Sequence, residues 1–591
     1  MGSEYADRSV HARIMSQPIT PQTHPPKGLM ASLKTDLLAS VRSRFRPRLL
    51  DHLDSYNRQT FLADLSAGLT VGFVALPLAM TFAIASGLPP QAGLFTAIVA
   101  GFLISLLGGS SVQIGGPAGA FIVVVYAIVD RYGVANLMIA TSCAGLLMTL
   151  MGILRLGNLI RLIPISIVTG FTSGIAVLIA LSQIKEFLGL RGPQLPAEFF
   201  AKVSALLGLL PTTHWITLLL GLACLAVILV WPKSHQAQTG PMGRAFSRLP
   251  GSLVAIVLST LAVTFLQLPV ETVGQRFGAI PTGLPVPSLP TFNWATVQFL
   301  LGPILTIALL GGIESLLCAR VADGMTKERH DPNQELVAQG LANIVSPFFG
   351  GFCATGTVAR TVTNIRAGAR TPVAGMIHAL TLLVIILGAA PLAEKIPLVA
   401  LAATALVVAY NMGEWDAFAR LRQFNQPYRI TFLTTFVLTV VIDITVAVEV
   451  GLLMAGVFFI HRMAQLTRFD PVSPEELQAE GLSTEHLINT EVRRLSGVLF
   501  FGAVSKIEPL LDPHHQTAPI LVLDLSGLLA VDSSGLDALK TLDQSLAARG
   551  TELRLTHIRP GVLSTMTQWG LVDHLGERRV FPTLRGALGL A

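Results

Sequence analysis

Two glycine-rich stretches interrupt the apolar sequence of this chain, and they limit its possible folds more than any other feature. They span residues 108–121 and 350–364. Each opens with Gly-Gly after an apolar run and passes through another glycine into a new apolar segment. Non-helical backbone at membrane depth is stable only when it is buried in protein or lines a wet cavity, because lipid cannot hydrogen-bond free N–H and C=O groups. Each stretch therefore predicts a broken membrane span.

The composition supports a membrane protein. Of 591 residues, 52% are hydrophobic and only 13% are charged, and the mean hydropathy is +0.63. Soluble domains carry about 25% charged residues. The net charge of +6 fits basic cytoplasmic loops, and no basic stripe with interleaved aromatics predicts a nucleic-acid partner. The four cysteines lie in or beside apolar segments without metal or disulfide spacing, so neither a metal nor a cofactor is expected.

Fourteen apolar segments follow one another between Phe61 and Met463. They are residues 61–86, 90–108, 117–130, 134–154, 162–188, 212–231, 250–268, 298–320, 333–349, 357–367, 371–391, 396–411, 427–446 and 447–463. The third and tenth are shorter than the ~20 residues that a full span needs. Both follow a glycine-rich break, at corresponding places in two halves of seven segments. This arrangement is typical of inverted-repeat transporters, whose binding site lies between the broken helices.

Lysine and arginine placement predicts the orientation in the membrane. Arg42, Arg44, Arg46 and Arg48 precede the first segment, and loops after even-numbered segments hold more Lys and Arg than the others. By the positive-inside rule, both termini face the cytoplasm and the protein is a multi-pass protein of the cell inner membrane. Residues 1–54 are expected to form a partly disordered cytoplasmic region.

The two breaks suggest an anion site. A helix that starts near Gly356 would direct its free N–H groups, carrying about +0.5 charge, at whatever lies in front. Arg360, about one turn in, would add a full charge. Pro117 suits the first turn of the opposing helix, and residues 111–115 and 352–356 can pair as a β-ribbon. Two alternatives stay open: glycine-rich turns also simply connect helices, and a lone arginine is often an interfacial anchor.

Glu314 is the strongest ionisable candidate inside a span, because burying a charge there costs about 2.5–3.5 kcal/mol even on the lenient insertion scale. It can carry a proton, or it can be permanently paired with Arg360 or hydrogen-bonded to a neighbouring helix. Other ionisable residues are interpreted as structural: His378 as hydrogen-bonded core, Asp443 and Glu449 as interfacial or structural, and Asp64 and Asp323 as helix-end residues.

The composition becomes typical of soluble proteins beyond Arg468. Strands are predicted at residues 496–503, 518–525 and 552–556, and a helix at 536–548 that Ser533 and Ser534 hydroxyls can cap. Alternation of strand and helix predicts a small α/β domain.

Several motifs together resemble one family. They are residues 67–72, 76–80, 311–317, 322–326, 333–336, 339–343, 348–351 and 364–368. In combination they resemble the SulP anion transporter family, and residues 524–526 with 531–536 resemble the STAS domain, the usual tail of that family. The resemblance implies a polytopic α-helical fold of 7+7 inverted repeats with 14 transmembrane segments. It implies a transport domain over residues 55–465 with core and gate subdomains, a cytoplasmic STAS domain over 466–591, and a homodimer.

The resemblance also implies specific contacts. The anion would lie against Gly116, Ala118, Gly119 and Phe121 on one side and Gly356, Thr357, Val358 and Ala359 on the other, with Arg360 beneath. Ser534 matches the position of a phosphorylated serine in related STAS proteins, against the alternative of a plain helix cap. The STAS domain is expected to regulate transport, assist dimerisation or bind a cytosolic protein.

Two departures from the family pattern bear on coupling. Many relatives have Gln or Glu where this chain has Leu78. Sodium-coupled bicarbonate members have an Asp at the Glu314 position and a Thr one turn later, where this chain has Cys318, a poor ligand for a hard cation. The expectation is therefore a transporter, not an enzyme, that takes up a small anion with a proton by alternating access.

The substrate stays open among a C4-dicarboxylate such as fumarate or succinate, sulfate and bicarbonate. The first-helix pattern resembles the dicarboxylate-transporting branch. An uncoupled anion exchanger or channel on the same scaffold is the alternative. A nucleobase–cation symporter shares the 7+7 fold but is disfavoured by Arg360 and the STAS tail.

Overall fold

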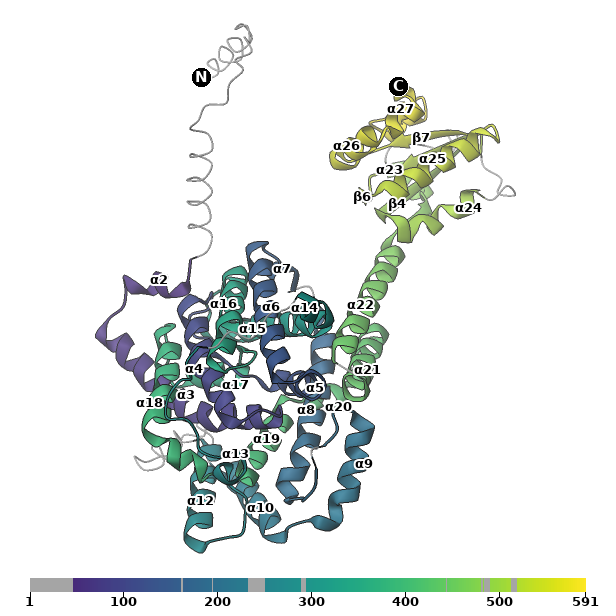
Figure 1. Cartoon of the computed structure of the whole chain (residues 1–591). Coiled ribbons are helices and arrows are strands. Elements are labelled where there is room, and N and C mark those ends of the chain that lie inside the picture. The colour runs from purple at the N-terminus through teal and green to yellow at the C-terminus, as the bar shows by residue number, and fades with distance from the viewer. Residues whose placement is uncertain are drawn as a thin grey trace. The chain divides into compact units, whose positions relative to one another are not determined.

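The computed structural model describes residues 46–160, 163–193, 195–231, 250–287, 294–442, 444–479, 482, 489–511 and 518–590. Most of the predicted N-terminal region and Asp443 lie outside these residues. The chain divides into two compact units (Figure 1). The first comprises Met1–Leu162, Ile179–Ala197 and Ala201–Tyr410, and the second comprises Ile163–Leu178, Glu198–Phe200 and Asn411–Ala591.

A helix lies in each of the fourteen predicted apolar segments. In chain order these helices are α3 (Arg58–Ala85), α4 (Pro90–Leu107), α5 (Ile122–Tyr132), α6 (Val134–Ile153), α8 (Ile165–Leu188), α10 (Trp215–Val230), α12 (Gly251–Leu266), α15 (Leu301–Thr326), α16 (Pro332–Val345), α17 (Val358–Arg366), α18 (Val373–Glu394), α19 (Leu398–Met412), α21 (Gln426–Val441) and α22 (Ile444–Leu466). Short helices join them: α2 (Arg48–Leu53), α7 (Gly157–Ile160), α13 (Val273–Phe277), α14 (Trp294–Phe299) and α20 (Trp415–Ala419). The periodic apolar runs thus become helices with their predicted boundaries shifted by a few residues.

One helix was not expected. Residues 199–209 form α9 (Phe199–Leu209), which runs through a 3-10 turn (Leu210–Thr212) and meets α10 at an angle of 112°. Lys202 interrupts its apolar pattern, and Pro211 separates it from α10, because proline lacks the N–H that would continue a helix. The sequence therefore suggested a loop here.

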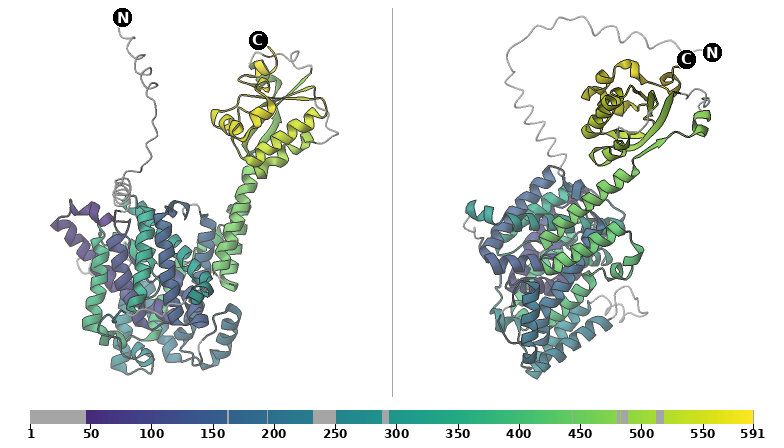
Figure 2. Two further views of the ribbon diagram at one scale, coloured as in Figure 1. Left: turned by 45° about the horizontal axis from the view of Figure 1, so that its top comes forward. Right: turned by 90° about the vertical axis from the view of Figure 1, so that its right-hand side faces the viewer.

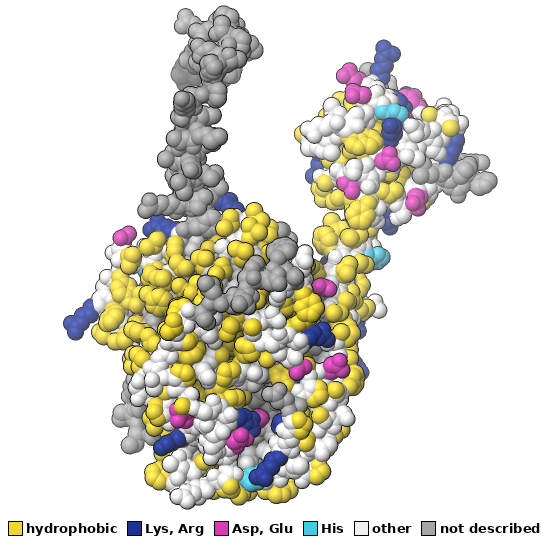
Figure 3. Space-filling model, in the orientation of Figure 1, with side chains coloured by type: hydrophobic (Ala, Val, Ile, Leu, Met, Phe, Trp, Pro, Cys, Tyr) yellow, Lys and Arg dark blue, Asp and Glu magenta, His cyan; other side chains and the backbone are white. Residues whose placement is uncertain are grey.

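Length and composition separate full spans from short ones. Among the described residues, seven helices are long and apolar enough to cross a membrane, or eight if the bent α9–α10 pair forms one span. The helices after the two breaks are short, with 11 residues in α5 and 9 in α17. Hydrophobic side chains cover much of the helical surface in Figure 3, as a lipid-facing exterior requires. Leu146, Leu219 and Phe265 are among the exposed ones.

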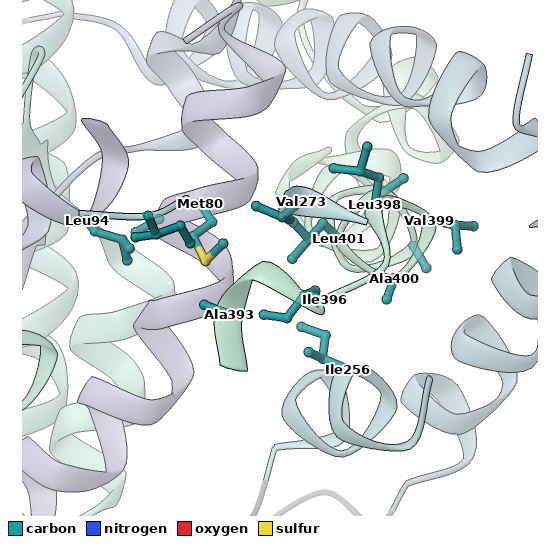
Figure 4. Close-up of a cluster of buried hydrophobic side chains, with 14 of the residues drawn as sticks. Met80, Leu94, Ile256, Val273, Ala393, Ile396, Leu398, Val399, Ala400 and Leu401 are labelled. Atoms are coloured by element: carbon teal, nitrogen blue, oxygen red, sulfur yellow. The ribbon is translucent and has the colours of Figure 1, made fainter. Parts of the chain in front are cut away.

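Small residues bring the helices of the first unit close together. Gly145 on α6 and Gly340 on α16 face each other, and a Cβ at Gly340 would collide with the Thr149 hydroxyl and the Gly145 carbonyl. Such small-residue contacts replace hydrophobic driving force in membrane helix packing. A separate apolar cluster around Met80, Leu94 and Ile256 joins α3 and α4 to α12, α13, α18 and α19 (Figure 4).

The C-terminal part of the second unit is an α/β domain that follows α22 (Figure 2). Its strands are β3 (Arg468–Pro471), β4 (Thr490–Leu499), β5 (Ile520–Asp524), β6 (Leu528–Val531), β7 (Glu552–Thr556) and β8 (Val580–Phe581). They form one sheet in the order β3-β4-β5-β7-β8, with β6 beside β4; β3 is antiparallel to β4 and the other pairs are parallel. The predicted strand at 496–503 was misplaced, because β4 ends at Leu499 and a 3-10 helix occupies Phe501–Lys506.

Helices cover both faces of this sheet. Leu521 and Leu523 of β5 pack in one apolar cluster with α25 (Ser533–Ala547), α26 (Pro560–Trp569) and α27 (Leu571–Leu575). Val522, between them, packs on the other face with α23 (Pro474–Ala479) and α28 (Leu584–Ala587). This alternation explains why β5 reads as a continuous apolar run: alternate residues serve opposite faces, and both faces are covered.

The N-cap residue of α25 differs from the predicted one. The side chain of Asp532 accepts the hydrogen bond from the Gly535 N–H, at 2.8 Å. Aspartate is a strong N-cap because its carboxylate satisfies one of the free N–H groups at the helix start. Ser533 and Ser534 are therefore the first residues of the helix rather than its cap.

Buried Asp524 holds the end of β5. Its carboxylate accepts hydrogen bonds from Arg494 Nε (2.6 Å) and the Ser526 N–H (3.0 Å), and contacts His557 Nδ1 (3.2 Å). Burial raises the pKa of Asp524, but the bonds from Arg494 and Ser526 outweigh burial and hold it below its ordinary value.

The close Gly145–Gly340 contact predicts that alanine will have different effects on stability at two helical glycines, Gly340 and Gly324. Gly340→Ala should lower the melting temperature of the detergent-solubilised protein, since overpacking costs about 1–3 kcal/mol. Gly324→Ala, on α15 with open space at its Cβ, should leave the melting temperature unchanged or raise it through better helix propensity. Equal effects at both positions would contradict the close packing of α6 on α16.

Asp524 predicts a pH-dependent stability of the C-terminal domain. Because its pKa is depressed by folding, its contribution is present above the unfolded-state pKa and is lost as pH falls through the folded-state pKa. At pH 7, Asp524→Asn should destabilise β4 and β5 by about 2 kcal/mol, seen as faster hydrogen exchange in the full-length protein. The difference from wild type should shrink in acid, and exposed Asp537→Asn should have no effect.

Candidate functional site

The two glycine-rich breaks meet inside the first unit. Strand β1 (Gly115–Gly116) pairs antiparallel with β2 (Thr355–Gly356), so that Gly115 is opposite Gly356 and Gly116 opposite Thr355. This confirms the predicted ribbon, although only two residues of each stretch form it. Residues 108–121 and 351–357 are all buried. The breaks are therefore enclosed by protein, as non-helical backbone at membrane depth requires.

Hydrogen bonds from α17 satisfy the backbone of the first break. The Thr361 hydroxyl accepts from the Ile114 N–H (2.9 Å), and the Thr357 N–H donates to the Ile114 carbonyl (2.9 Å). One turn further on, Asn364 Nδ2 donates to the Val112 carbonyl (2.9 Å). The threonines that follow the second break thus hold the first break in place.

The second break is held from the opposite side. Asn343 of α16 exchanges two hydrogen bonds of 2.8 Å with the Ala354 backbone. The Thr96 hydroxyl accepts from the Phe352 N–H (2.8 Å), and the Thr355 hydroxyl donates to the Gly311 carbonyl (2.8 Å). Side chains of α4 and α16 therefore replace helical hydrogen bonds that the break removes, and the Thr355 side chain anchors the break to the backbone of α15.

Both short helices begin at the ribbon. Helix α17 starts at Val358, directly after Thr357, and α5 starts through a 3-10 turn at Gly119–Phe121. Neither start has a side-chain cap. At α17 the Thr357 hydroxyl donates to the Ile114 carbonyl instead, and at the turn before α5 the cap position is Ala118, which has no side-chain oxygen. The N–H groups at these two starts carry partial positive charge.

Arg360 joins the two halves. Its side chain belongs to α17, is 1% exposed, and donates from Nη2 to the carbonyl of Pro117 at the start of the other broken helix. Nη1 has no hydrogen-bond partner and no carboxylate pairs with the guanidinium, within the part of the chain that the structure describes. Gly116 has φ +149°, and a Cβ there would lie 2.5 Å from Nη1. Glycine at this position therefore leaves room for the guanidinium.

Glu314 lies in the middle of α15 and is 8% exposed. Its Oε1 has no hydrogen-bond partner, and no ion pair joins it to Arg360, among the described side chains. The alternative of a permanent Glu314–Arg360 pair is therefore not observed. Cys318, one turn later, contacts the Thr361 hydroxyl at 3.2 Å, and no cluster of three metal-ligating side chains occurs in the described ranges.

A buried polar network behind the ribbon was not singled out from the sequence. The carboxylate of Glu335, on α16, accepts from the Gly109 N–H (2.9 Å), Gln339 Nε2 (2.8 Å) and the Ser315 hydroxyl (3.3 Å). Ser315 in turn accepts from Gln113 Nε2 (3.0 Å), and the Gln113 amide fills the space beside Gly356. The signal was available: Gln334-Glu335 and Gln339 place polar side chains on an otherwise apolar helix.

Asp64 was wrongly interpreted as a helix-end residue. It is buried within α3 and accepts hydrogen bonds from the N–H groups of Arg370 (2.8 Å) and Thr371 (3.2 Å) and from the Thr371 hydroxyl (2.6 Å). The Tyr56 hydroxyl contacts it at 3.3 Å. Burial and the Asp64 charge raise the pKa of Tyr56 to about 12. Asp64 thus fixes the turn before α18.

The remaining ionisable candidates have structural surroundings. Asp323, near the end of α15, accepts from the His330 N–H and contacts its Nδ1 (3.0 and 2.7 Å), as expected of a helix-end residue. Glu449 is exposed. His378 is buried on α18, and neither ring nitrogen has a hydrogen-bond partner among the described residues, which differs from the predicted hydrogen-bonded core histidine.

Comparison with known proteins agrees with this architecture. The model of the sulfate permease family matches residues 61–436, and that of the STAS domain matches residues 484–587. The putative sulfate transporter YvdB of Bacillus subtilis (strain 168) is 37% identical over 536 residues, which cover 90% of this chain and 98% of that protein. The bicarbonate transporter BicA of Picosynechococcus sp. is 32% identical over 461 residues, covering 75% and 79% respectively.

A solved structure shows the same fold. The murine solute carrier 26 family member A9 anion transporter, in its inward-facing state, has a TM-score of 0.81 at 18% identity and covers 97% of this chain and 99% of that chain. The predicted polytopic 7+7 fold with a C-terminal STAS domain is confirmed. The fold and both family matches together place this chain among anion transporters and not enzymes: it belongs to the sulfate permease family.

Proposed function

We propose that this protein is a secondary active transporter that takes up a small anion together with a proton by alternating access. The anion lies between the starts of α5 and α17. On the first side it contacts Gly116, Ala118, Gly119 and Phe121. On the second side it contacts Gly356, Thr357, Val358 and Ala359, with Arg360 beneath.

The buried guanidinium of Arg360 is the observation that carries this proposal. A buried charge without a counter-ion costs several kcal/mol even after relaxation. Arg360 has a carbonyl on Nη2 and no partner on Nη1, within the described part of the chain. An anion bound by Nη1 and by the N–H groups of the two helix starts would offset that cost. Its release would break the same hydrogen bonds.

The anion is small, and three kinds are candidates: a C4-dicarboxylate such as fumarate or succinate, sulfate, or bicarbonate. Relatives named as sulfate and bicarbonate transporters support the last two. The pattern of the first helix, which resembles the dicarboxylate branch, supports the first. All three carry oxygens that accept hydrogen bonds from N–H groups.

Proton coupling is assigned to Glu314. Its carboxyl oxygen Oε1 has no hydrogen-bond donor, and no cation pairs with it, among the described residues. Such a group is stable in the membrane when protonated and can release its proton when the site opens to water. Cys318 stands where sodium coupling would need an oxygen ligand, which favours a proton over sodium.

The surrounding organisation is part of the same proposal. The transport domain spans residues 55–465, with core and gate subdomains that move past each other, and the STAS domain spans 466–591. The protein acts as a homodimer in the cell inner membrane with both termini in the cytoplasm. Ser534, in the first turn of α25 beside the Asp532 cap, is the candidate phosphosite, through which a cytosolic partner could regulate transport.

Removal of the Arg360 charge tests the binding site. Arg360→Ala should weaken binding of the transported anion by at least 10- to 100-fold, because a charge-assisted hydrogen bond contributes about 1.5–3 kcal/mol. Binding and counterflow with labelled fumarate, succinate, sulfate and bicarbonate would measure this in proteoliposomes and identify the substrate. Arg366→Ala, an exposed arginine on the same helix, is the matched control. Retained affinity in Arg360→Ala would contradict the site.

Neutralisation of Glu314 tests the coupling. In wild-type proteoliposomes an inward proton gradient should stimulate uptake, whereas Glu314→Gln should transport at a rate that no longer responds to the gradient. Glu449→Gln, at an exposed carboxylate, should keep the response. An unchanged gradient response in Glu314→Gln would remove Glu314 from coupling, and a wild-type protein that ignores the gradient would favour the uncoupled exchanger or channel.

A further inference from the structure

A second polar cavity lies in the first unit, away from the ribbon. It has a volume of about 320 Å³ and lies between the C-terminal ends of α3 and α8, the middle of α5, and helices α9 and α13. Its polar lining includes Tyr126, Lys185, Glu186, Lys202 and Arg276. Since a water molecule takes about 30 Å³ in the liquid, this volume is sufficient for a small hydrated anion.

Lys202 is the unusual member of this lining. It is only 7% exposed, yet its ammonium group makes no ion pair and no hydrogen bond in the described part of the chain. Its Nζ lies 5.1 Å from the ring centroid of Tyr126, which is fixed by a hydrogen bond from its hydroxyl to the Leu195 carbonyl. The aromatic face stabilises the cation only in part. All three ammonium donors remain available to a ligand.

The charged side chains of the cavity differ in how closely they are paired. Lys185 donates to the carbonyls of Gly192 (2.9 Å) and Pro193 (2.6 Å). No carboxylate forms an ion pair with it among the described residues, although the charge of Glu186 acts on it. Arg276 is compensated, because it pairs with both Glu186 and Glu271. Within the lining itself, one carboxylate, Glu186, lies beside three cations. Asp130, one turn beyond Tyr126 on α5, is exposed; its charge acts on Lys202, but the two side chains form no ion pair.

The cavity is connected to the Arg360 site by a single helix. Tyr126 follows Phe121 by five residues on α5, which is about 7.5 Å along the helix axis. The loops that close the cavity follow the first and fifth apolar segments, which the predicted topology places on the outer side of the membrane. A solute that enters past Lys202 would therefore meet α5 first and the start of that helix next.

We propose that the cavity around Lys202 is a second anion-binding site, which captures the small oxyanion substrate from the outer side and passes it to the Arg360 site. This inference rests on the proposed function, because it assumes that the chain carries an anion. Lys202 supplies a charge without a direct ion-pair partner, Lys185 adds a second, and Glu186 is engaged in an ion pair with Arg276. The site concentrates the anion without holding it tightly, since it is partly open to water.

A purely structural Lys202 is the competing explanation, because a buried lysine stem also fills space. The variants Lys202→Gln, Lys202→Met and Lys202→Arg separate the two. Methionine keeps most of the stem without the charge, and arginine keeps the charge with a different stem. Lys540→Gln in the C-terminal domain is the matched control, because its Nζ also lies over an aromatic ring, 5.7 Å from that of Trp569.

The test uses uptake by the full-length protein in proteoliposomes over a range of labelled sulfate or succinate concentrations. Lys202→Gln and Lys202→Met should raise KM about 5- to 10-fold and change kcat less than twofold. Lys202→Arg and Lys540→Gln should keep the wild-type KM. Added inert salt should raise the wild-type KM and have a smaller effect on the two neutral variants, because screening acts on the free charge.

A second measurement distinguishes this inference from the proposed function. In Arg360→Ala, which lacks the central site, weak anion binding should persist and should disappear in Arg360→Ala combined with Lys202→Gln. An unchanged KM in both neutral variants, or a loss of kcat alone, would overturn the capture site while leaving the Arg360 site intact. If Lys202→Gln and Lys202→Met fail to fold and Lys202→Arg has an unchanged KM that ignores salt, the capture site is likewise overturned.

Discussion

The fold depends on one constraint: backbone that leaves a helix inside a membrane must find its hydrogen bonds in the protein. Two chain segments that are more than 200 residues apart satisfy it for each other. The Ile114 N–H donates to the Thr361 hydroxyl, and the Ile114 carbonyl accepts from the Thr357 N–H. A neighbouring helix completes the set, because Asn343 of α16 exchanges two hydrogen bonds with the Ala354 backbone. The β1–β2 ribbon therefore fixes the positions of the starts of α5 and α17 relative to each other. It brings the N-terminal ends of both helices, which carry partial positive charge, close together.

Glycine at this ribbon is required by contact rather than by flexibility alone. A Cβ at Gly116 would reach Arg360, and one at Gly356 would collide with the Gln113 amide. Gln113 is held by Ser315, and Ser315 donates to Glu335. Because the network is buried and each member has a partner, a shift at the ribbon would break several hydrogen bonds at once.

The sequence predicted the helices and the ribbon because their signals are local: apolar periodicity, Gly-Gly breaks and short segments behind them. It missed α9, where Lys202 and Pro211 obscure an apolar helix that is bent against α10. It misplaced Asp64, because the carboxylate binds the turn at Arg370 and Thr371, more than 300 residues away. Glu335 and its partners were missed for the same reason. Polar groups on different helices become a network only through tertiary packing, which no single stretch of sequence displays.

The absence of a Glu314–Arg360 pair in the described structure bears on the proposed proton coupling. If the two were paired, protonation of Glu314 would break the ion pair and free Arg360 for an anion, so the pair itself would couple the two ligands. Kept apart on α15 and α17, the carboxyl is stable in a dry site only when protonated, and the guanidinium only when it faces an anion. Binding of both partners then brings the buried charges close to balance. In the proposed mechanism, a site loaded with both ligands could therefore cross between the two sides of the membrane, whereas a site that carries the anion without the proton would retain an uncompensated charge.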